Sequence, residues 1–436
     1  MSNLVAKTGN GLEMYVSAGL DIGNGYVKGA IKNLMGGKVT TIDMPSCASV
    51  ISHPQDLKPE ESEVPNVVKD IYDQLDVVIG SPMVTETRRL YIGARSVNSG
   101  TRPFEFNVAS HLSKANDPLS IMLMLSCIAG KAVKDIYEDM HGFPDTVITI
   151  HAVLGLALPI REYVKHGTEY REKLMKQPHM VTVHNFSKDI VFQVVLEDVA
   201  IIAEGVAAQY AISGQSEKFM QGVLQYARKA MEEVYGPSCH TNLLFDVQPQ
   251  EVLGAMNTVG LDIGEGTVNM PVFRNGAFVP DVSSNLPIGY GSVLADALNE
   301  LQDNGYPFKT RKELTEYLNI QPSRMQKASY DKVKAIVDNH VTNLVESIIV
   351  DFTTAMSKAG AVVEVVYIYG GGATPVRDEL YRKLMETMRV NQQENVIMLY
   401  MDSQWSRYLN REGLLVIADM KAEKLKEIAE NATKNA

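Results

Sequence analysis

The most constraining feature of the sequence is a seven-residue segment that occurs twice. GLDIGNG stands at 19–25 and GLDIGEG at 260–266, with six of the seven positions identical. An apolar segment precedes each copy, and an extended segment follows it, with a Gly-Gly pair at 36–37 and an Asn-Gly pair at 275–276. Such pairs favour hairpins because both residue types tolerate positive φ. Each copy therefore predicts a strand, a tight turn, a second strand, a hairpin and a third strand, and the repetition predicts two related domains.

The residue types of the repeated turn suit a phosphate ligand. Glycine lets a ligand approach the backbone closely, and successive N–H groups in such a turn form an anion site. A carboxylate starts each turn, Asp21 in the first copy and Asp262 in the second. Because a carboxylate repels phosphate unless a cation lies between them, the pattern predicts Mg²⁺ held by these carboxylates, water and phosphate oxygens. Lys28 would add positive charge in the first copy, and Thr267 would add a hydroxyl in the second.

A glycine-rich turn can also be a plain connection or belong to a different nucleotide-binding motif. A single Asp-Gly turn is most often a hairpin connection, so the repetition carries the prediction of a phosphate site. The spacing after the first turn is GxGxxxG and a strand-like segment follows it, which does not fit a dinucleotide-binding loop before a helix. No GxxxxGK[ST] segment occurs, which excludes a P-loop.

Length and composition bound the class of protein. A chain of 436 residues predicts two domains or more. The net charge of −11 and the lack of a long basic run argue against direct binding of nucleic acid. Three scattered cysteines without a CxxC pair predict neither a zinc site nor a disulfide framework. The longest apolar stretch, 121–130, is too short to cross a membrane, so we expect a soluble cytoplasmic protein without membrane contact.

A third glycine segment lies near the C-terminus. Residues 362–373 read VVEVVYIYGGGA, a β-branched and aromatic run that predicts a buried strand ending in three glycines. A helical pattern follows, with Thr374 as a candidate N-cap and Pro375 at the first helical position. A strand that leads through glycines to a helix N-terminus suits a ligand, and a tight strand–helix turn explains the same pattern equally well.

The order of the three glycine segments resembles that of the actin superfamily of ATPases. Residues 19–29 match its first phosphate motif, 260–267 its second and 367–373 its adenosine motif. Softer matches in YIGARS, VLGLALPIREY and PIGYGSVLADALNEL resemble the ParM-type plasmid-segregation proteins. The resemblance implies an α/β, actin-like fold in which two ribonuclease-H-like domains flank a nucleotide cleft.

The resemblance also implies a division of the chain. Domain I would comprise 1–203 together with 405–436, and domain II would comprise 204–404 with a helical insertion at about 309–358. Residues 201–211 would form a helix that links the domains, and 406–418 a second connection. The acidic stretch 53–66 departs from the family pattern and would be a solvated loop or a filament contact; the end of the chain, 421–436, would be a charged helix or a frayed tail.

The implied ligands are ATP, with GTP as an open alternative, and Mg²⁺ held by Asp21 and Asp262. Glu204 would orient or deprotonate the attacking water, although a lone glutamate on a helix is by itself most often a surface residue. Lys312 would reach the adenine or ribose. The full implied set comprises catalytic Glu204, Asp21 and Asp262, and nucleotide-binding Gly23, Asn24, Gly25, Tyr26, Lys28, Gly264, Glu265, Gly266, Thr267, Lys312, Gly370, Gly371, Gly372 and Ala373.

The implied function is ATP-driven assembly. ATP-bound subunits would join head to tail into filaments, and hydrolysis would destabilise them. A DNA-binding adaptor on the plasmid would connect the filament to its cargo. A small-molecule kinase of the same superfamily is the main alternative, and a cell-shape or pilus-assembly homologue is another.

Overall fold

The computed structural model describes residues 4–8, 11–52, 58–106, 113–360, 362–401 and 403–434. The chain forms two compact units. Unit 1 contains residues 1–158, 162–203 and 410–436, and unit 2 contains 159–161 and 204–409. The chain therefore passes from one unit to the other after Leu158, Arg161, Ala203 and Leu409.

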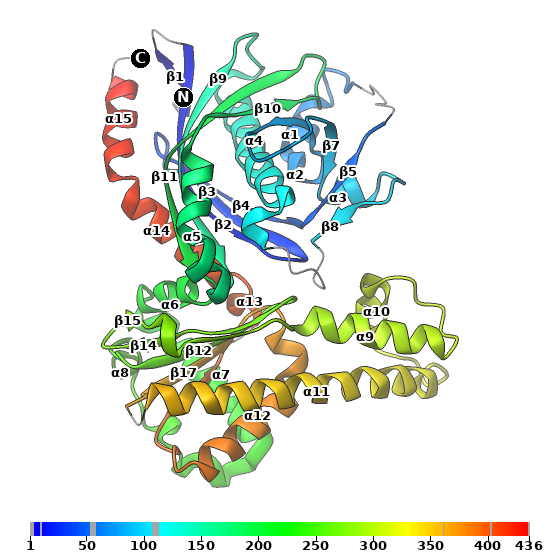
Figure 1. Cartoon of the computed structure of the whole chain (residues 1–436), viewed down its shortest axis with the longest axis vertical. Coiled ribbons are helices and arrows are strands. Elements are labelled where there is room, and N and C mark those ends of the chain that lie inside the picture. The colour runs from blue at the N-terminus through cyan, green and yellow to red at the C-terminus, as the bar shows by residue number, and fades with distance from the viewer. Residues whose placement is uncertain are drawn as a thin grey trace. The chain divides into compact units, whose positions relative to one another are not determined.

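Unit 1 is built on one sheet with the strand order β4-β3-β2-β9-β11-β10-β6-β7-β5-β8, and β1 pairs with β2 (Figure 1). β9 runs parallel to both β2 and β11, whereas β3 and β4 form an antiparallel meander with β2. Its elements are β1 (Ala6–Thr8), β2 (Gly11–Ile22), β3 (Tyr26–Asn33), β4 (Val39–Pro45), β5 (Cys47–Val50), α1 (Val64–Lys69), α2 (Ile71–Gln74), β6 (Asp76–Gly80), β7 (Arg89–Ile92), α3 (Ala94–Val97), β8 (Phe104–Glu105), η1 (Lys114–Asn116), α4 (Pro118–Met140), β9 (Ile148–Leu158), α5 (Ile160–Met175), β10 (His179–Val183), β11 (Ile190–Ala203), α14 (Leu409–Lys421) and α15 (Glu423–Lys434).

The two faces of β2 meet different helices because side chains alternate along a strand. Met14, Leu20 and the other even-numbered residues from 14 to 22 join the main core beneath α4. The odd-numbered residues lie on the other face, where Tyr15 packs in a smaller cluster with Ala418 and Leu425 of the C-terminal helices. Figure 1 shows α4 on one side of these strands and α14 and α15 on the other. Asp21 is the last odd-numbered residue of β2 and belongs to the α14 face.

Two glycines let α14 lie directly on the sheet. Gly19 of β2 and Gly155 of β9 are paired neighbours, and a Cβ on either would overlap the backbone of Leu414 or Leu415. Polar contacts reinforce the packing, because Asp419 accepts hydrogen bonds from Ser17 (2.8 Å) and Lys32 (2.7 Å). The position of α14 therefore depends on small residues in the strand that leads to the first turn.

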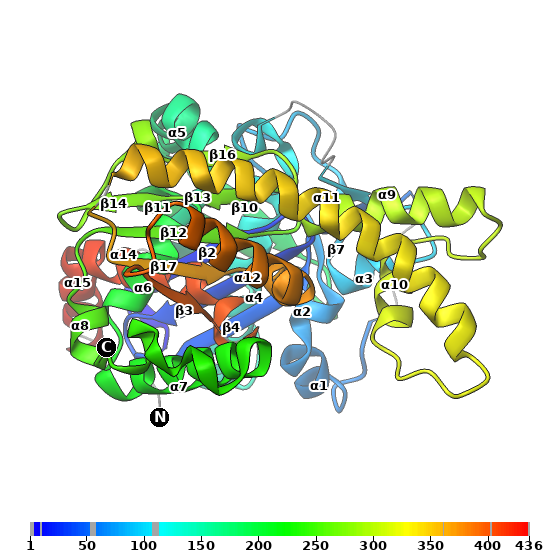
Figure 2. The same ribbon diagram turned by 90° about the horizontal axis from the view of Figure 1, so that it is seen from below.

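Unit 2 has its own sheet, with the order β15-β14-β12-β13-β16 and with β17 between β12 and β18. In Figure 2 the long helix α11 runs beside α12 and α9, and it contacts both. The elements are α6 (Val206–Ser213), α7 (Glu217–Tyr235), η2 (Gly236–Thr241), η3 (Leu243–Phe245), α8 (Pro249–Leu253), β12 (Thr258–Ile263), β13 (Val268–Met270), β14 (Val272–Arg274), β15 (Ala277–Phe278), η4 (Pro280–Val282), β16 (Ser284–Leu286), α9 (Tyr290–Asp303), α10 (Arg311–Leu318), α11 (Lys327–Ala359), β17 (Val365–Tyr369), α12 (Ala373–Val390), β18 (Ile397–Tyr400) and α13 (Ser403–Ser406).

The two units repeat one arrangement. In each, the strand before the Asp turn pairs antiparallel with the strand that follows it and parallel with a later strand, β9 in unit 1 and β17 in unit 2. The predicted Asn-Gly hairpin at 275–276 is confirmed, with φ of 50° and 75° at its two residues. Gly260 corresponds to Gly19 in the repeat, and a Cβ there would meet Pro271 and the hydroxyl of Tyr369. A glycine two residues before the aspartate thus permits a close contact in both units.

Two expected helix boundaries are wrong. Residues 201–203 end β11 instead of starting a helix, because they continue the parallel pairing with β9, and α6 begins only at Val206. The third glycine segment leads to a helix that starts at Ala373, so Thr374 is not its N-cap and Pro375 is not its first residue. The amide of Ala373 already bonds to the carbonyl of Gly370 (3.2 Å), which brings the first turn of the helix forward.

The two segments that depart from the family pattern differ in structure. Residues 53–57 lie outside the described residues, and 58–63 form an irregular segment before α1. The end of the chain forms α15, and its buried Leu425 and Ala429 pack near β1 and β2. None of the helices in the described part of the chain is long and apolar enough to cross a membrane.

The contact of α14 with the sheet predicts the effect of adding one methyl group. Gly155→Ala should lower the free energy of unfolding by about 1–3 kcal/mol, because the new Cβ overlaps the Leu414 carbonyl. Gly142→Ala is the matched control, since a Cβ there meets nothing within 4 Å, and it should change stability by less than about 0.5 kcal/mol. Urea unfolding followed by circular dichroism measures both variants. Equal stability of the two would contradict the close contact.

The Asp419 contacts predict a dependence of stability on pH. Burial alone would raise the pKa of Asp419, but the hydrogen bonds from Lys32 and Ser17 outweigh it and hold the pKa below its ordinary value of 3.8. A lowered folded-state pKa adds stability above pH 3.8, which is lost as the pH falls through the folded-state pKa. Asp419→Asn should therefore lower the melting temperature at pH 7, and the difference from the wild type should shrink below pH 3.8. Glu172→Gln, an exposed change on α5, is the control; a difference independent of pH would contradict this role.

Candidate functional site

The first Asp turn is a closed hairpin turn in which the carbonyls of both glycines accept hydrogen bonds. The amide of Gly23 donates to the carbonyl of Tyr26 (3.0 Å), which closes the turn. Ser46 donates from its hydroxyl to Gly23 O (2.7 Å) and from its amide to Gly25 O (2.9 Å). Asn24 lies between these glycines, and the Tyr26 side chain is exposed. Ser46 was not predicted, because it follows β4 and reaches the turn only through the meander.

Asp21 and Lys28 form the charged part of the first turn. They are opposite each other in the β2–β3 register, and Lys28 Nζ lies 3.8 Å from Asp21 Oδ2. Asp21 is 6% exposed, and the Lys28 side chain is also largely covered. The pair therefore offers a carboxylate and a cation beside the same backbone turn.

The second Asp turn has the same closing hydrogen bond. The amide of Gly264 donates to the carbonyl of Thr267 (2.9 Å), as Gly23 does to Tyr26 in the first copy. The start of α9 covers this turn, because Tyr290 donates to Gly264 O (3.0 Å) and Gly291 donates to Glu265 O (2.8 Å). The predicted equivalence of the two turns is confirmed at the level of the backbone.

Glu204 lies against the second turn. It follows β11 directly, before Gly205 with its φ of 79°, and is 7% exposed. Its Oε2 atom accepts hydrogen bonds from the hydroxyl of Thr267 (3.2 Å) and from Nδ2 of Asn269 (2.9 Å). The structure thus brings together Glu204 and Thr267, which lie far apart in the sequence, and adds Asn269, which was not predicted.

Arg311 supplies a cation at the second turn. Its guanidinium pairs with Glu265 (3.0 Å), and both side chains are about one-third exposed. Lys312, the predicted residue, is 69% exposed and lies 3.9 Å from Glu316 one helical turn away. Adjacent helix positions point about 100° apart, which separates these two residues. The assignment of Lys312 to the nucleotide stays a prediction, and Arg311 is the residue that the structure places at the turn.

The third glycine segment packs against the second turn. Gly370 has a φ of 101°, and a Cβ there would overlap the carbonyl of Ile263 and the carboxylate of Asp262. Gly372 donates its amide to Ile263 O (2.8 Å). Gly371 differs from both, since a Cβ there would meet nothing within 4 Å. The outer two glycines therefore serve this packing, whereas Gly371 is exposed and has open space beside it.

A hydrogen bond from the buried Tyr369 hydroxyl supports this packing. Burial, with the Asp262 carboxylate nearby, holds the pKa of Tyr369 well above its ordinary value of 10. The hydroxyl therefore stays protonated and donates to the carbonyl of Gly205 (2.8 Å). This bond ties the end of β17 to the residue that follows Glu204.

Each Asp turn carries one buried carboxylate, a type of group that binds Mg²⁺. Asp21 and Asp262 are 6% and 5% exposed, and each lies near the end of the strand before its turn. Among the described residues, no group of three or more His, Cys, Asp or Glu could hold a metal ion. Mg²⁺ commonly keeps several waters and binds through one or two carboxylates and phosphate oxygens, so either carboxylate taken by itself is a suitable donor.

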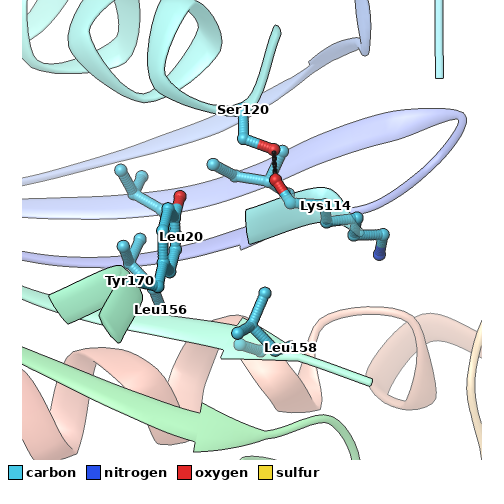
Figure 3. Close-up of a pocket in the computed structure, with 8 residues that line it drawn as sticks. Leu20, Lys114, Ser120, Leu156, Leu158 and Tyr170 are labelled. Atoms are coloured by element: carbon cyan, nitrogen blue, oxygen red, sulfur yellow. Dashed lines mark hydrogen bonds between the residues drawn. The ribbon is translucent and has the colours of Figure 1, made fainter. Parts of the chain in front are cut away.

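A small cavity lies in unit 1, lined in part by Leu20 and Ile22 at the end of β2. It has about 10 Å³ of space, roughly room for one water. Figure 3 shows Leu20, Leu156 and Tyr170 on one side of it, with the Lys114 amine directed away from them. Its lining residues are Leu20, Ile22, Lys114, Ser120, Leu156, Ala157, Leu158 and Tyr170. The cavity is too small for a nucleotide, so the glycine turns remain the candidate site.

Comparison with known proteins gives the class of the fold. Residues 19–206 match the family profile described as the N-terminal domain of actin-like proteins. This segment is similar to the N-terminal domain of actin-like proteins, and the likeness to solved structures shows that the chain as a whole has the actin-like fold. The predicted resemblance and fold class are therefore confirmed. No curated protein matches the chain in a sequence comparison.

The solved structures that resemble the chain include actin-like proteins from bacteria and archaea. The actin-like protein Alp7A matches with a TM-score of 0.63 and 16% identity, over 97% of this chain and 100% of the other. ParM of Bacillus thuringiensis with ATP matches with a TM-score of 0.54 and 15% identity, over 93% and 99%. An archaeal actin homologue matches with a TM-score of 0.56 and 14% identity, over 93% and 99%. At these identities the likeness shows the fold.

Because the three glycines at 370–372 have different surroundings, they should differ in how much a Gly→Ala substitution destabilises the protein. Gly370→Ala should lower the free energy of unfolding by about 1–3 kcal/mol, because its positive φ and its overlap with Ile263 O both oppose a side chain. Gly371→Ala, the matched control one residue later, should leave stability within about 0.5 kcal/mol of the wild type. Thermal unfolding measures both variants. A stable Gly370→Ala protein would contradict the packing of this loop on the second turn.

Proposed function

We propose that the chain is an ATPase that assembles into filaments in a nucleotide-dependent way and moves plasmid DNA through an adaptor protein. The observation that carries this proposal is the pair of matching Asp turns, each closed by the same backbone hydrogen bond (3.0 Å and 2.9 Å). The actin-like fold supports it, and ParM of Bacillus thuringiensis, a protein of that fold, has been solved with ATP and with AMPPNP.

Each motif has a proposed part in nucleotide binding. The amides around residues 23–25 and 264–267 would hold the phosphates, with Lys28 and Arg311 adding positive charge. Asp21 and Asp262 would bind Mg²⁺ through its waters, and the ion would neutralise the phosphate charge that develops during hydrolysis. Gly371 would allow the nucleotide to approach the start of α12, where helix N–H groups favour an anion. ATP is the proposed nucleotide, and GTP is an alternative that a binding measurement distinguishes.

Glu204 has the proposed role in hydrolysis. A carboxylate held by Thr267 and Asn269 has a fixed orientation, which general-base or water-positioning chemistry requires. Such positioning, together with charge stabilisation, accounts for most of the rate in phosphoryl transfer. The proposed reaction is therefore attack of an oriented water on the terminal phosphorus, with ADP and phosphate as products.

The proposed assembly into filaments would depend on the division of the motifs between the two units. The first Asp turn belongs to unit 1, and the second turn, Glu204 and the GGGA segment belong to unit 2. A nucleotide that binds all of them would link the nucleotide state to the angle between the units, and so to subunit contacts. The proposed filament is head to tail, an open heterologous symmetry. Its cytoplasmic setting and its adaptor are part of the proposal, and the net charge of −11 favours a basic adaptor over direct DNA contact.

The test is light scattering after addition of Mg-ATP across a series of protein concentrations, with phosphate release followed in parallel. We expect scattering to rise above a critical concentration and to decay as ATP is hydrolysed. Glu204→Ala should assemble equally well, release phosphate at least about 100-fold more slowly, because it lacks the positioned carboxylate, and keep its filaments.

Two outcomes would contradict parts of the proposal. A flat scattering trace with intact ATP binding would reject the filament and favour a small-molecule kinase, which a screen of hydroxyl acceptors would then test. Wild-type phosphate release by Glu204→Ala would remove Glu204 from the mechanism while leaving assembly in place.

A further inference from the structure

The two copies of the repeat differ at the residue opposite the aspartate. In the β2–β3 register Asp21 faces Lys28, and in the β12–β13 register Asp262 faces Asn269. Each partner lies seven residues after its aspartate, so Lys28 and Asn269 occupy the same place in the repeat. A cation in one copy thus corresponds to a neutral amide in the other.

Both ends of the Asn269 amide are hydrogen-bonded, and its orientation is fixed. Oδ1 accepts from Nδ2 of Asn285 (2.8 Å) and from the amide of Ile160 (3.3 Å). Because the Ile160 amide can only donate, this end of the side chain must be the oxygen. Nδ2 therefore points the other way, to Glu204 Oε2 (2.9 Å) and Thr267 Oγ1 (3.2 Å).

Burial makes this contact strong and specific. Asn269 is 2% exposed, Asn285 is 5% and Glu204 is 7%. A buried carboxylate needs hydrogen-bond donors, and a neutral amide supplies them without forming an ion pair. A lysine at this position, as in the first copy, would form an ion pair with Glu204 and lower its basicity. The neutral amide therefore fixes the orientation of the Glu204 carboxylate without pairing it with a charge.

We propose that Asn269 is a positioning residue that sets the orientation of the Glu204 carboxylate for attack by water. The inference rests on the proposed function, and it assigns different roles to the equivalent residues of the repeat. Lys28 supplies charge beside Asp21, and Asn269 orients Glu204. A purely structural role for Asn269, as a link between β13 and β16, would leave both the turnover rate of the folded protein and its pH profile unchanged.

The experiment measures ATP hydrolysis by the full chain as a function of ATP concentration and pH. Asn269→Ala should lower kcat about 10- to 100-fold and leave KM for Mg-ATP within about twofold, since the residue acts through Glu204. Asn269→Asp places two carboxylates in contact, and such a pair retains a shared proton to higher pH. The acid limb of its pH–rate profile should therefore move up by about one unit or more. Asn395→Asp, the same change at an exposed position before β18, is the matched control.

The outcomes separate the two proposals. An active wild type with unchanged kcat and pH profile in both variants overturns the positioning role and leaves the proposed function intact. A wild type that releases no phosphate overturns the proposed function and this role with it. If circular dichroism shows that the Asn269 variants do not fold, Asn285→Ala decides, because it removes one of the donors that orient the amide. A fall in its kcat of about threefold or more at unchanged KM supports the role, and a smaller change overturns it.

Discussion

In each unit, a neighbouring segment packs directly on the strand that leads to the Asp turn. The contact is made at a glycine two residues before the aspartate, and the packing around that strand depends on it. In unit 1 the backbone of α14 lies on Gly19 and Gly155, and in unit 2 Tyr369 and Pro271 lie against Gly260. Any side chain at these positions would push the packed segment away from the strand. Since the strand continues for only a few residues to its Asp turn, the same contact positions the carboxylate and the glycine amides that follow it.

From this shared framework the two copies acquire different surroundings. The first turn keeps a charged partner, Lys28, and its carbonyls are held by Ser46. The second turn is covered by α9 and lies beside the GGGA segment, and its Thr267 hydroxyl donates to Glu204. At the first turn the cation thus lies beside the aspartate, whereas at the second turn the cation, Arg311, pairs with Glu265 and neutral donors hold Glu204. In the proposed function, the cation beside Asp21 would meet phosphate charge and the held carboxylate would meet the attacking water.

Local signals predicted a large part of the fold. The repeated turn, the Asn-Gly hairpin and the strand before GGGA depend on φ preferences and alternation, which short segments carry by themselves. The helix start at Val206 and the roles of Ser46, Arg311 and Asn269 depend on contacts between segments distant in the chain, so no short segment shows them. Glu204 was reached only through family resemblance, because a single glutamate carries no local pattern, and its role stays a proposal.

The most direct measurement is an experimental structure of the full chain with Mg²⁺ and a non-hydrolysable ATP analogue. We expect phosphate oxygens within hydrogen-bond distance of the amides at 23–25 and at 264–267, with the metal beside Asp21 and Asp262 and the nucleoside near Gly371. Nucleotide bound elsewhere, or phosphates in contact with only one of the two turns, would contradict the claim that the repeated turn is a phosphate site used twice.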